Sequence, residues 1–139
     1  MLIVNFHYEV LEDEFTHAGV ASTKVKKTLK QLGLSPDIIR KVAIAMYEAE
    51  INMVIHAQGG FIDVEITPEE VYIVLEDNGP GIEDIELAMK AGYSTASDKA
   101  REMGFGAGMG LPNIKRNSDH LSITSKKGEG TKVEITIYL

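Results

Sequence analysis

Apolar and polar residues alternate along several short stretches of this chain, with the period of two that is typical of a β-strand. In the first stretch Val4, Phe6, Tyr8 and Val10 share one face. Two further pairs of stretches flank short turns, so each pair is predicted to form an antiparallel hairpin. The predicted strands cover residues 3–11, 61–66, 71–75, 121–124 and 131–139.

Apolar residues at helical spacing separate these strands. One helix is predicted to begin at Phe15 and to end before Gly33, a residue type that favours the left-handed conformation after a helix. A second helix is predicted from Pro36, which suits a first helical turn, to His56. The apolar stripe of the first helix is Val20, Val25, Leu29 and Leu32. Shorter helices are predicted over residues 82–91 and 111–119, with a mobile loop over 92–103.

This order of elements has no regular strand–helix–strand alternation. We therefore expect an α+β fold, a two-layer sandwich in which helices cover one face of a mixed, mainly antiparallel sheet. The length of 139 residues predicts a single domain over residues 1–139. The glycine patterns of the Rossmann fold and of the P-loop are both absent, which disfavours the two commonest nucleotide-binding folds.

Composition excludes several classes of function. The chain has no cysteine, so it forms no disulfide and no thiolate metal site. Its formal net charge of −7 argues against nucleic acid as a partner. No apolar stretch approaches the length of a membrane span, and the start does not resemble a signal peptide. We expect a cytoplasmic protein that does not enter a membrane.

The predicted second helix carries two polar residues with oxygen atoms that could bind a hard cation. Glu48 and Asn52 lie four residues apart and so share one helix face. Their carboxylate and amide oxygens suit Mg²⁺, and the carboxylate could instead act as a general base. The plain alternative is that they form the solvated face of the helix. Glu50 points to another face and is expected to have no special role.

Two glycine clusters predict a ligand held largely by the main chain. Asp77 ends a strand and precedes the first cluster, where a carboxylate could accept a hydrogen bond from an exocyclic amine; an ordinary Asp-Asn-Gly turn is the alternative. The second cluster, Gly104–Gly110, has a glycine at every second position before a predicted helix, which is typical of an anion site. Lys99 and Arg101 precede it and could reach a terminal phosphate or could be ordinary solvated charges.

In order and spacing these motifs resemble the nucleotide-binding boxes of the GHKL ATPase superfamily, which includes gyrase, histidine kinases and anti-sigma factor serine kinases and has the Bergerat ATP-binding fold. The resemblance covers nearly the whole chain. The motifs are Glu48-x-x-x-Asn52, Asp77-x-Gly79-x-Gly81, Gly106-x-Gly108-x-Gly110 and Gly130-Thr131. Within the superfamily, Gly92-Tyr93-Ser94-Thr95 and Gly110–Arg116 are most similar to the small bacterial switch kinases of the anti-sigma factor type.

The resemblance implies a role for each motif. Glu48 is the implied catalytic base, and Asn52 the implied ligand of Mg²⁺ and of the nucleotide. Residues 92–105 are the implied lid over ATP. The residues implied to hold adenine are Asp77, Gly79, Gly81, Ile82 and Thr131. Those implied to hold the phosphates are Lys99, Arg101, Gly106, Gly108, Met109, Gly110 and Leu111.

The implied activity is transfer of the ATP γ-phosphate to a serine or threonine of a small partner, either an antagonist-type acceptor or a sigma-factor-like protein, and a homodimer is compatible with the family. Two departures from the family pattern concern the lid: an additional segment, Asp98–Phe105, and the presence of Ala107 and Met109 where leucines are usual. Two other functions stay open. One is a nucleotide-gated binding protein with little kinase activity, and the other is a stand-alone catalytic domain of a histidine-kinase system.

Overall fold

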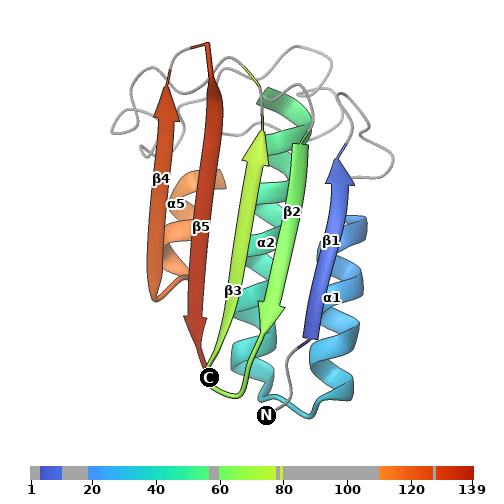
Figure 1. Cartoon of the computed structure of the whole chain (residues 1–139). Coiled ribbons are helices and arrows are strands. Elements are labelled where there is room, and N and C mark those ends of the chain that lie inside the picture. Colours follow the sequence, from blue (N-terminus) through green and yellow to red (C-terminus); the bar gives the residue numbers. More distant parts are fainter. Residues whose placement is uncertain (1–3, 11–18, 57–59, 78, 80–109, 127) are drawn as a thin grey trace, which may run out of the picture.

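The computed structural model describes residues 4–10, 19–56, 60–77, 79, 110–126 and 128–139. The helix predicted over 82–91 and the loop predicted over 92–103 lie outside them. The elements follow one another as β1 (Val4–Val10), α1 (Val20–Gln31), α2 (Pro36–His56), β2 (Gly60–Ile66), β3 (Glu70–Asp77), α5 (Gly110–Arg116), β4 (His120–Lys126) and β5 (Gly130–Tyr138) (Figure 1).

The five strands form one sheet in the order β1-β2-β3-β5-β4. The hairpin between β2 and β3 closes at Thr67, whose N–H donates to the carbonyl oxygen of Glu70 at 3.0 Å. β5 pairs with β3 although they are far apart in sequence, with Val71 opposite Ile137. All four pairings are antiparallel, so the described strands contain none of the parallel pairs that a mixed sheet requires. The expected α+β class and mainly antiparallel sheet are confirmed.

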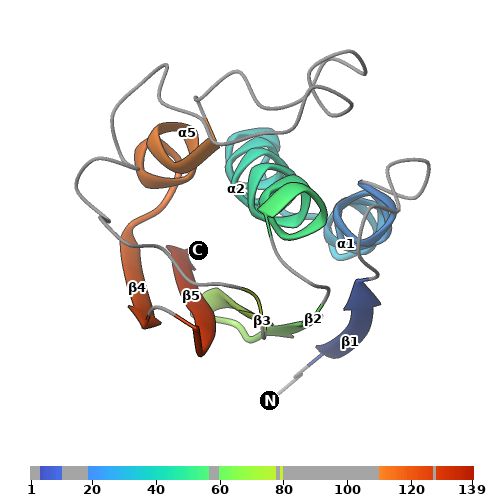
Figure 2. The same ribbon diagram turned by 90° about the horizontal axis from the view of Figure 1, so that it is seen from above.

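The helices form a second layer on one face of this sheet. Seen from above, α1, α2 and α5 stand side by side along the concave face (Figure 2). Strand alternation directs one row of apolar side chains toward the helices, where they exclude water and drive folding. The fully buried side chains of this core include Val25, Leu29, Val42, Met46, Ile62, Val64, Val71, Ile73, Leu75, Ile114, Ile135 and Ile137.

Helix α1 begins at Val20, later than the predicted start at Phe15. Gly19 directly precedes it with a φ of 91°, a left-handed conformation that cannot be part of the helix. Val25 and Leu29 are buried as predicted, but Val20 and Leu32 are 41% and 37% exposed. Ala21 and Ser22 occupy the buried face one turn before Val25, and this rotates Val20 toward solvent. Gly33 follows the helix with a φ of 76°, as expected.

Helix α2 has the bounds that the sequence predicted and runs along the strand direction behind the middle of the sheet (Figure 1). Ser35 caps its first turn by accepting a hydrogen bond from the N–H of Ile38 at 3.4 Å. Val42, Ala45, Met46 and Ala49 form its buried stripe. None of the described helices is long and apolar enough to cross a membrane.

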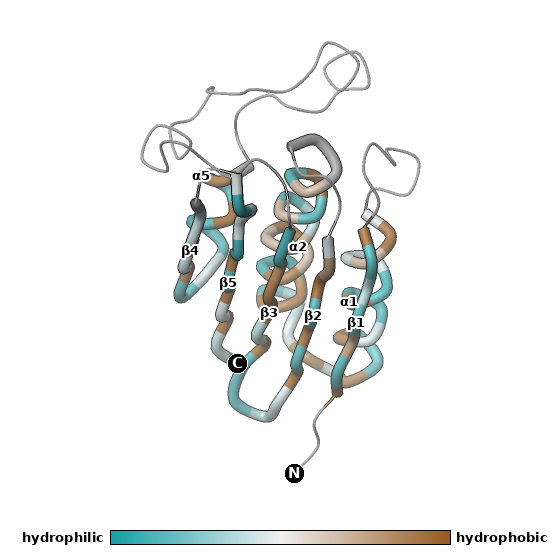
Figure 3. Tube along the Cα trace, turned by 45° about the horizontal axis from the view of Figure 1, so that its top comes forward, coloured by the Kyte–Doolittle hydropathy of each residue, from teal (hydrophilic) through white to brown (hydrophobic). Residues whose placement is uncertain are grey.

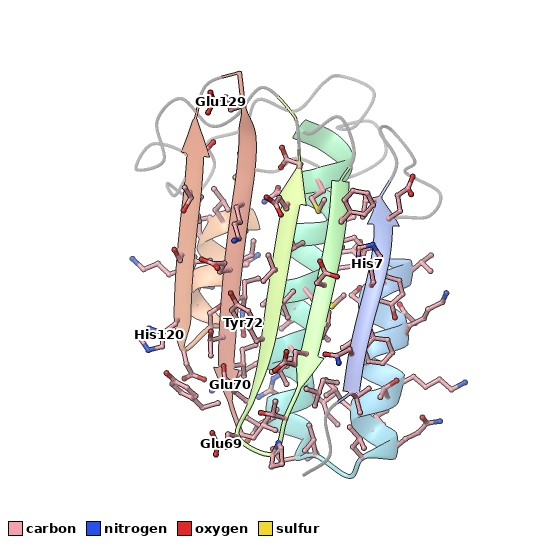
Figure 4. All side chains as sticks on the ribbon, in the orientation of Figure 1. His7, Glu69, Glu70, Tyr72, His120 and Glu129 are labelled. Atoms are coloured by element: carbon pink, nitrogen blue, oxygen red, sulfur yellow. The ribbon has the colours of Figure 1, made fainter. Side chains whose placement is uncertain are left out.

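The other face of the sheet is polar. Along the tube in Figure 3, hydrophilic and hydrophobic residues alternate within the strands. Figure 4 looks onto the face without helices, where His7 and Tyr72 lie on β1 and β3. The carboxylates that the pairing register assigns to this face are Glu9, Asp63, Glu65, Glu70, Glu76 and Glu134.

Candidate functional site

Asp77 is the last residue of β3 and lies at the end of the sheet where β2 and β5 begin (Figure 1). One of its carboxylate oxygens, Oδ1, accepts two backbone hydrogen bonds. The N–H of Gly79 donates at 2.8 Å and the N–H of Thr131, on β5, donates at 3.2 Å. Among the described residues nothing donates to the second oxygen, Oδ2. Asp77 therefore holds a fixed carboxylate with one oxygen left to accept.

Burial raises the pKa of the Asp77 carboxyl group above its ordinary value, and the N–H donors of Gly79 and Thr131 oppose this rise. The net direction is upward because partial desolvation outweighs the two hydrogen bonds. A carboxylate in such surroundings gains from a further donor. The alternative of an ordinary Asp-Asn-Gly turn accounts for the bond to Gly79 but not for the bond to Thr131, 54 residues away.

Thr131 is fixed by the hairpin of β4 and β5. It lies opposite Ser125 in the register, and the two hydroxyl oxygens are 2.8 Å apart. Ser125 also donates from its hydroxyl to the carbonyl oxygen of Gly130 at 3.2 Å. Gly130 has a φ of 99°, a conformation that suits glycine at the start of this strand. The hairpin predicted for this part of the chain thus positions the backbone N–H of Thr131 that binds Asp77.

Gly60 brings the end of α2 close to Asp77. It lies directly opposite Asp77 in the pairing of β2 with β3. A Cβ atom at Gly60 would be 2.7 Å from the Cε of Met53 and 2.9 Å from the Cα of Asp77, and closer still to the carbonyl oxygen of Glu76. Only glycine allows this approach. The turn of α2 that carries Asn52 and Met53 therefore packs beside the strand end that carries Asp77.

Glu48 and Asn52 are both half-buried on α2. Two small, buried residues, Ala45 and Ala49, lie near them on the same helix. Glu48 faces α5, because its Oε1 accepts a hydrogen bond from the Nδ2 of Asn113 at 3.4 Å. The plain alternative of a freely solvated helix face does not fit a side chain that contacts a second helix.

The expectation that Glu50 has no special role is wrong. Glu50 is only 3% exposed, and its two carboxylate oxygens accept the N–H groups of Ala21 and Ser22 at 3.2 and 3.1 Å. These N–H groups belong to the first turn of α1 and have no partner within that helix. Glu50 therefore caps α1 from a different helix. Helical spacing shows that Glu50 faces away from Glu48, but it does not show which element lies on that side.

Only some of the predicted site residues can be placed. Gly79 is buried beside Asp77, Gly110 begins α5, and Leu111 packs against the core. The predicted residues that lie outside the described part of the chain are Gly81, Ile82, Lys99, Arg101, Gly106, Gly108 and Met109.

Asn113 is a site residue that motif reasoning did not single out. It lies in α5, three residues after Gly110, and contacts Glu48 from 65 positions away in the sequence. No local pattern marks such a contact, since it arises from the packing of α5 on α2. The described residues also contain no cluster of three or more His, Cys, Asp or Glu side chains that could enclose a metal ion by themselves.

Comparison with known proteins agrees with this arrangement. Residues 37–139 match the family described as histidine kinase-, DNA gyrase B- and HSP90-like ATPases. The serine/threonine-protein kinase RsbT of Bacillus subtilis is 32% identical over 118 residues, which cover 82% of this chain and 83% of RsbT. The anti-sigma F factor of Clostridium beijerinckii is 36% identical over 121 residues, which cover 83% of this chain and 81% of that protein.

The fold has known counterparts as well. The crystal structure of the RsbU and RsbW domains of a Mycobacterium tuberculosis protein superposes with a TM-score of 0.60 at 16% identity, over 96% of this chain and 32% of that one. At that identity the likeness concerns the fold alone. Together with the family match and the two relatives, it shows that this chain belongs to the histidine kinase-, DNA gyrase B- and HSP90-like (GHKL) ATPase family.

Proposed function

We propose that this protein is a regulatory serine/threonine kinase that transfers the γ-phosphate of ATP to a hydroxyl group of a small partner protein. The family uses ATP, and relatives named as a serine/threonine kinase and as an anti-sigma factor support a regulatory kinase. One observation carries the proposal: Glu48, half-buried on α2, faces α5 and shares a helix face with Asn52, near the strand end that holds Asp77.

Asp77 is the proposed adenine ligand. Its Oδ1 is already engaged by the N–H groups of Gly79 and Thr131, which fixes the plane of the carboxylate. Oδ2 is then directed to accept a hydrogen bond from the exocyclic amine of adenine. Guanine carries a carbonyl oxygen at that position, which would repel the carboxylate. The site therefore favours ATP over GTP, and the remaining proposed base-binding residues are Gly81 and Ile82.

Asn52 is the proposed protein ligand of Mg²⁺. The donor set fits this ion, because Mg²⁺ binds oxygen atoms, keeps several waters and takes phosphate oxygens from the nucleotide, so it needs few protein ligands. Asn52 offers one amide oxygen from a half-buried position. When bound, Mg²⁺ neutralises charge that develops on the phosphates. The other proposed phosphate-binding residues are Lys99, Arg101, Gly106, Gly108, Met109, Gly110 and Leu111.

Glu48 is the proposed general base. Its carboxylate takes the proton of the acceptor hydroxyl while the hydroxyl oxygen attacks the γ-phosphorus. The bond from phosphorus to the bridging β–γ oxygen breaks, and its electron pair leaves with ADP. The products are ADP, a phosphoserine or phosphothreonine, and a protonated Glu48 that returns its proton to water. We propose that residues 1–139 form one such domain and that it works in the cytoplasm.

A second candidate function is nucleotide-gated binding of a sigma-factor-like protein without transfer. The relative named as an anti-sigma F factor favours it. Both functions require a protein partner, and the second also requires that its binding depend on nucleotide, so partner capture is the first experiment. Pulldowns in ATP, in ADP and without nucleotide should recover a partner that differs between the three conditions.

The recovered partner is then analysed for phosphate. A phosphoserine or phosphothreonine that appears only with ATP supports the kinase. ATP-dependent binding without any phosphate supports the second candidate, and an acid-labile phosphate indicates a histidine-kinase system. A partner that binds equally in all three conditions contradicts the second candidate, and recovery of no partner contradicts both.

A further inference from the structure

We infer that Asn113 is a positioning residue that holds the proposed base, Glu48, in its working orientation; this inference rests on the proposed kinase function. The Nδ2 of Asn113 lies 3.4 Å from the Oε1 of Glu48. Among the described residues, this is the one hydrogen bond that the Glu48 side chain makes. A glutamate on a helix can otherwise sample several rotamers, and only some of them direct its carboxylate at a substrate.

The chemistry of the contact suits a base. A carboxylate has two oxygens that can accept, and an amide N–H on Oε1 leaves Oε2 available for the proton of the acceptor hydroxyl. A lysine or arginine at position 113 would form an ion pair that favours the charged carboxylate and weakens it as a base. A neutral amide donor orients the carboxylate with a smaller effect of this kind. The length of 3.4 Å fits a contact that shortens when substrates close the site.

The backbone around Asn113 is well anchored. Ile114, the next residue, is fully buried in the core. The carbonyl oxygen of Asn113 accepts from the side-chain Nδ2 and the backbone N–H of Asn117, at 2.8 and 3.2 Å. Ser118 donates from its hydroxyl to the carbonyl oxygen of Ile114 at 2.6 Å. These bonds fix the end of the helix that presents Asn113, and the buried Ile114 holds that helix on the core.

The position of Asn113 also relates the base to the glycine-rich segment. Asn113 follows Gly110, the last glycine of that segment, by only three residues on the same short helix. A shift of α5 that accompanies phosphate binding would move Asn113 relative to Glu48. The base is therefore oriented by the element whose start is proposed to contact the phosphates.

The test compares phosphate transfer by Asn113→Asp and Asn113→Ala with wild type, using γ-labelled ATP, Mg²⁺ and the partner recovered by pulldown. Asn113→Asp keeps the shape but replaces the donor with a carboxylate oxygen that repels Glu48, so it tests the polar contact with packing preserved. We expect kcat to fall roughly three- to tenfold for Asn113→Ala and further for Asn113→Asp, with an unchanged KM for ATP. Lys115→Ala is the matched control, since it alters an exposed residue of the same helix and leaves the anchoring of Asn113 intact, and it should keep the wild-type kcat.

A double-mutant cycle gives the second readout. If Asn113 acts through Glu48, then Asn113→Ala has no further effect on the residual rate of Glu48→Ala. Wild-type kcat in both Asn113 variants, equal loss in Lys115→Ala, a change confined to KM, or additive losses in the cycle would each overturn the inference. A wild-type protein that transfers no phosphate would instead contradict the proposed function itself.

Discussion

Asp77 is a residue whose two carboxylate oxygens have different surroundings, and this makes its role testable. Oδ1 accepts two backbone N–H groups, and an amide oxygen in Asp77→Asn could accept both of them. The amide nitrogen would then replace Oδ2 and present a donor where the amine of adenine also donates. We expect Asp77→Asn to fold and to lose most of its ATP affinity, measured by calorimetric titration. ATP binding of wild-type strength would contradict the assignment.

The same substitution should stabilise the protein without nucleotide. Burial raises the pKa of Asp77 in the folded protein above its value in the unfolded chain. The protonated carboxyl group therefore favours folding, and this contribution to the free energy of unfolding is lost as the pH rises through the pKa of the folded state. At neutral pH the charged Asp77 therefore costs stability, and the neutral asparagine avoids this cost. In urea unfolding, Asp77→Asn should be more stable than wild type near pH 7, and its advantage should shrink as the solution is acidified toward pH 3.8, the ordinary pKa of aspartate. A constant difference at all pH values would argue against the charge as the cause.

At the scale of elements, Glu50 links α1 to α2. It satisfies the N–H groups of Ala21 and Ser22 in the first turn of α1, where a negative charge also interacts favourably with the helix dipole. The pKa of Tyr8, on β1, is raised mainly by burial and secondly by the negative charge of Glu50. The charge of Glu50 therefore also acts on β1. Glu50 is therefore a structural residue. Glu48 lies on the same helix but on a different face, toward α5.

Glu50→Ala should destabilise the protein by about 2–4 kcal/mol, because it leaves two buried N–H groups without acceptors. Glu50→Gln should cost less, since its single amide oxygen can still accept. Urea unfolding measures both, and ATP affinity at temperatures where the variants are folded should stay near wild type. A stability change below about 0.5 kcal/mol, the range typical of surface substitutions, would contradict the capping role.

A substitution at Gly60 tests the contact between α2 and the end of β3 that carries Asp77. Its substitution by alanine forces apart Met53 and the backbone of β3 beside Asp77. We expect Gly60→Ala to lower both the Tm and the affinity for ATP. Gly33→Ala is the control: Gly33 has a positive φ of 76°, so an alanine there is strained, but no atom lies within 4 Å of the added Cβ, so this variant should lower the Tm alone. Unchanged ATP affinity in Gly60→Ala would show that the strand end tolerates the displacement.

For the whole molecule, local pattern predicted the elements better than their contacts. The alternation in β1 and the Ser35-Pro36 start of α2 act over a few residues, and both predictions are confirmed. The later start of α1 depends on Gly19 in the left-handed conformation. A single glycine in a sequence does not predict that conformation. Glu50 and Asn113 escaped prediction for another reason. Their partners lie 28, 29 and 65 positions away, so the contacts exist only once the helices have packed.

Phosphate transfer requires the proposed base Glu48, whereas nucleotide binding alone does not. A substitution of Glu48 therefore distinguishes a kinase from a protein that only binds nucleotide. The most direct measurement is single-turnover phosphate transfer from γ-labelled ATP to the recovered partner, with wild type, Glu48→Gln and the exposed control Glu65→Gln, all at saturating ATP and Mg²⁺. The account predicts transfer by wild type and Glu65→Gln, a loss of roughly 100-fold or more with Glu48→Gln, and ATP affinity near wild type in all three. Equal transfer rates for Glu48→Gln and wild type would contradict it.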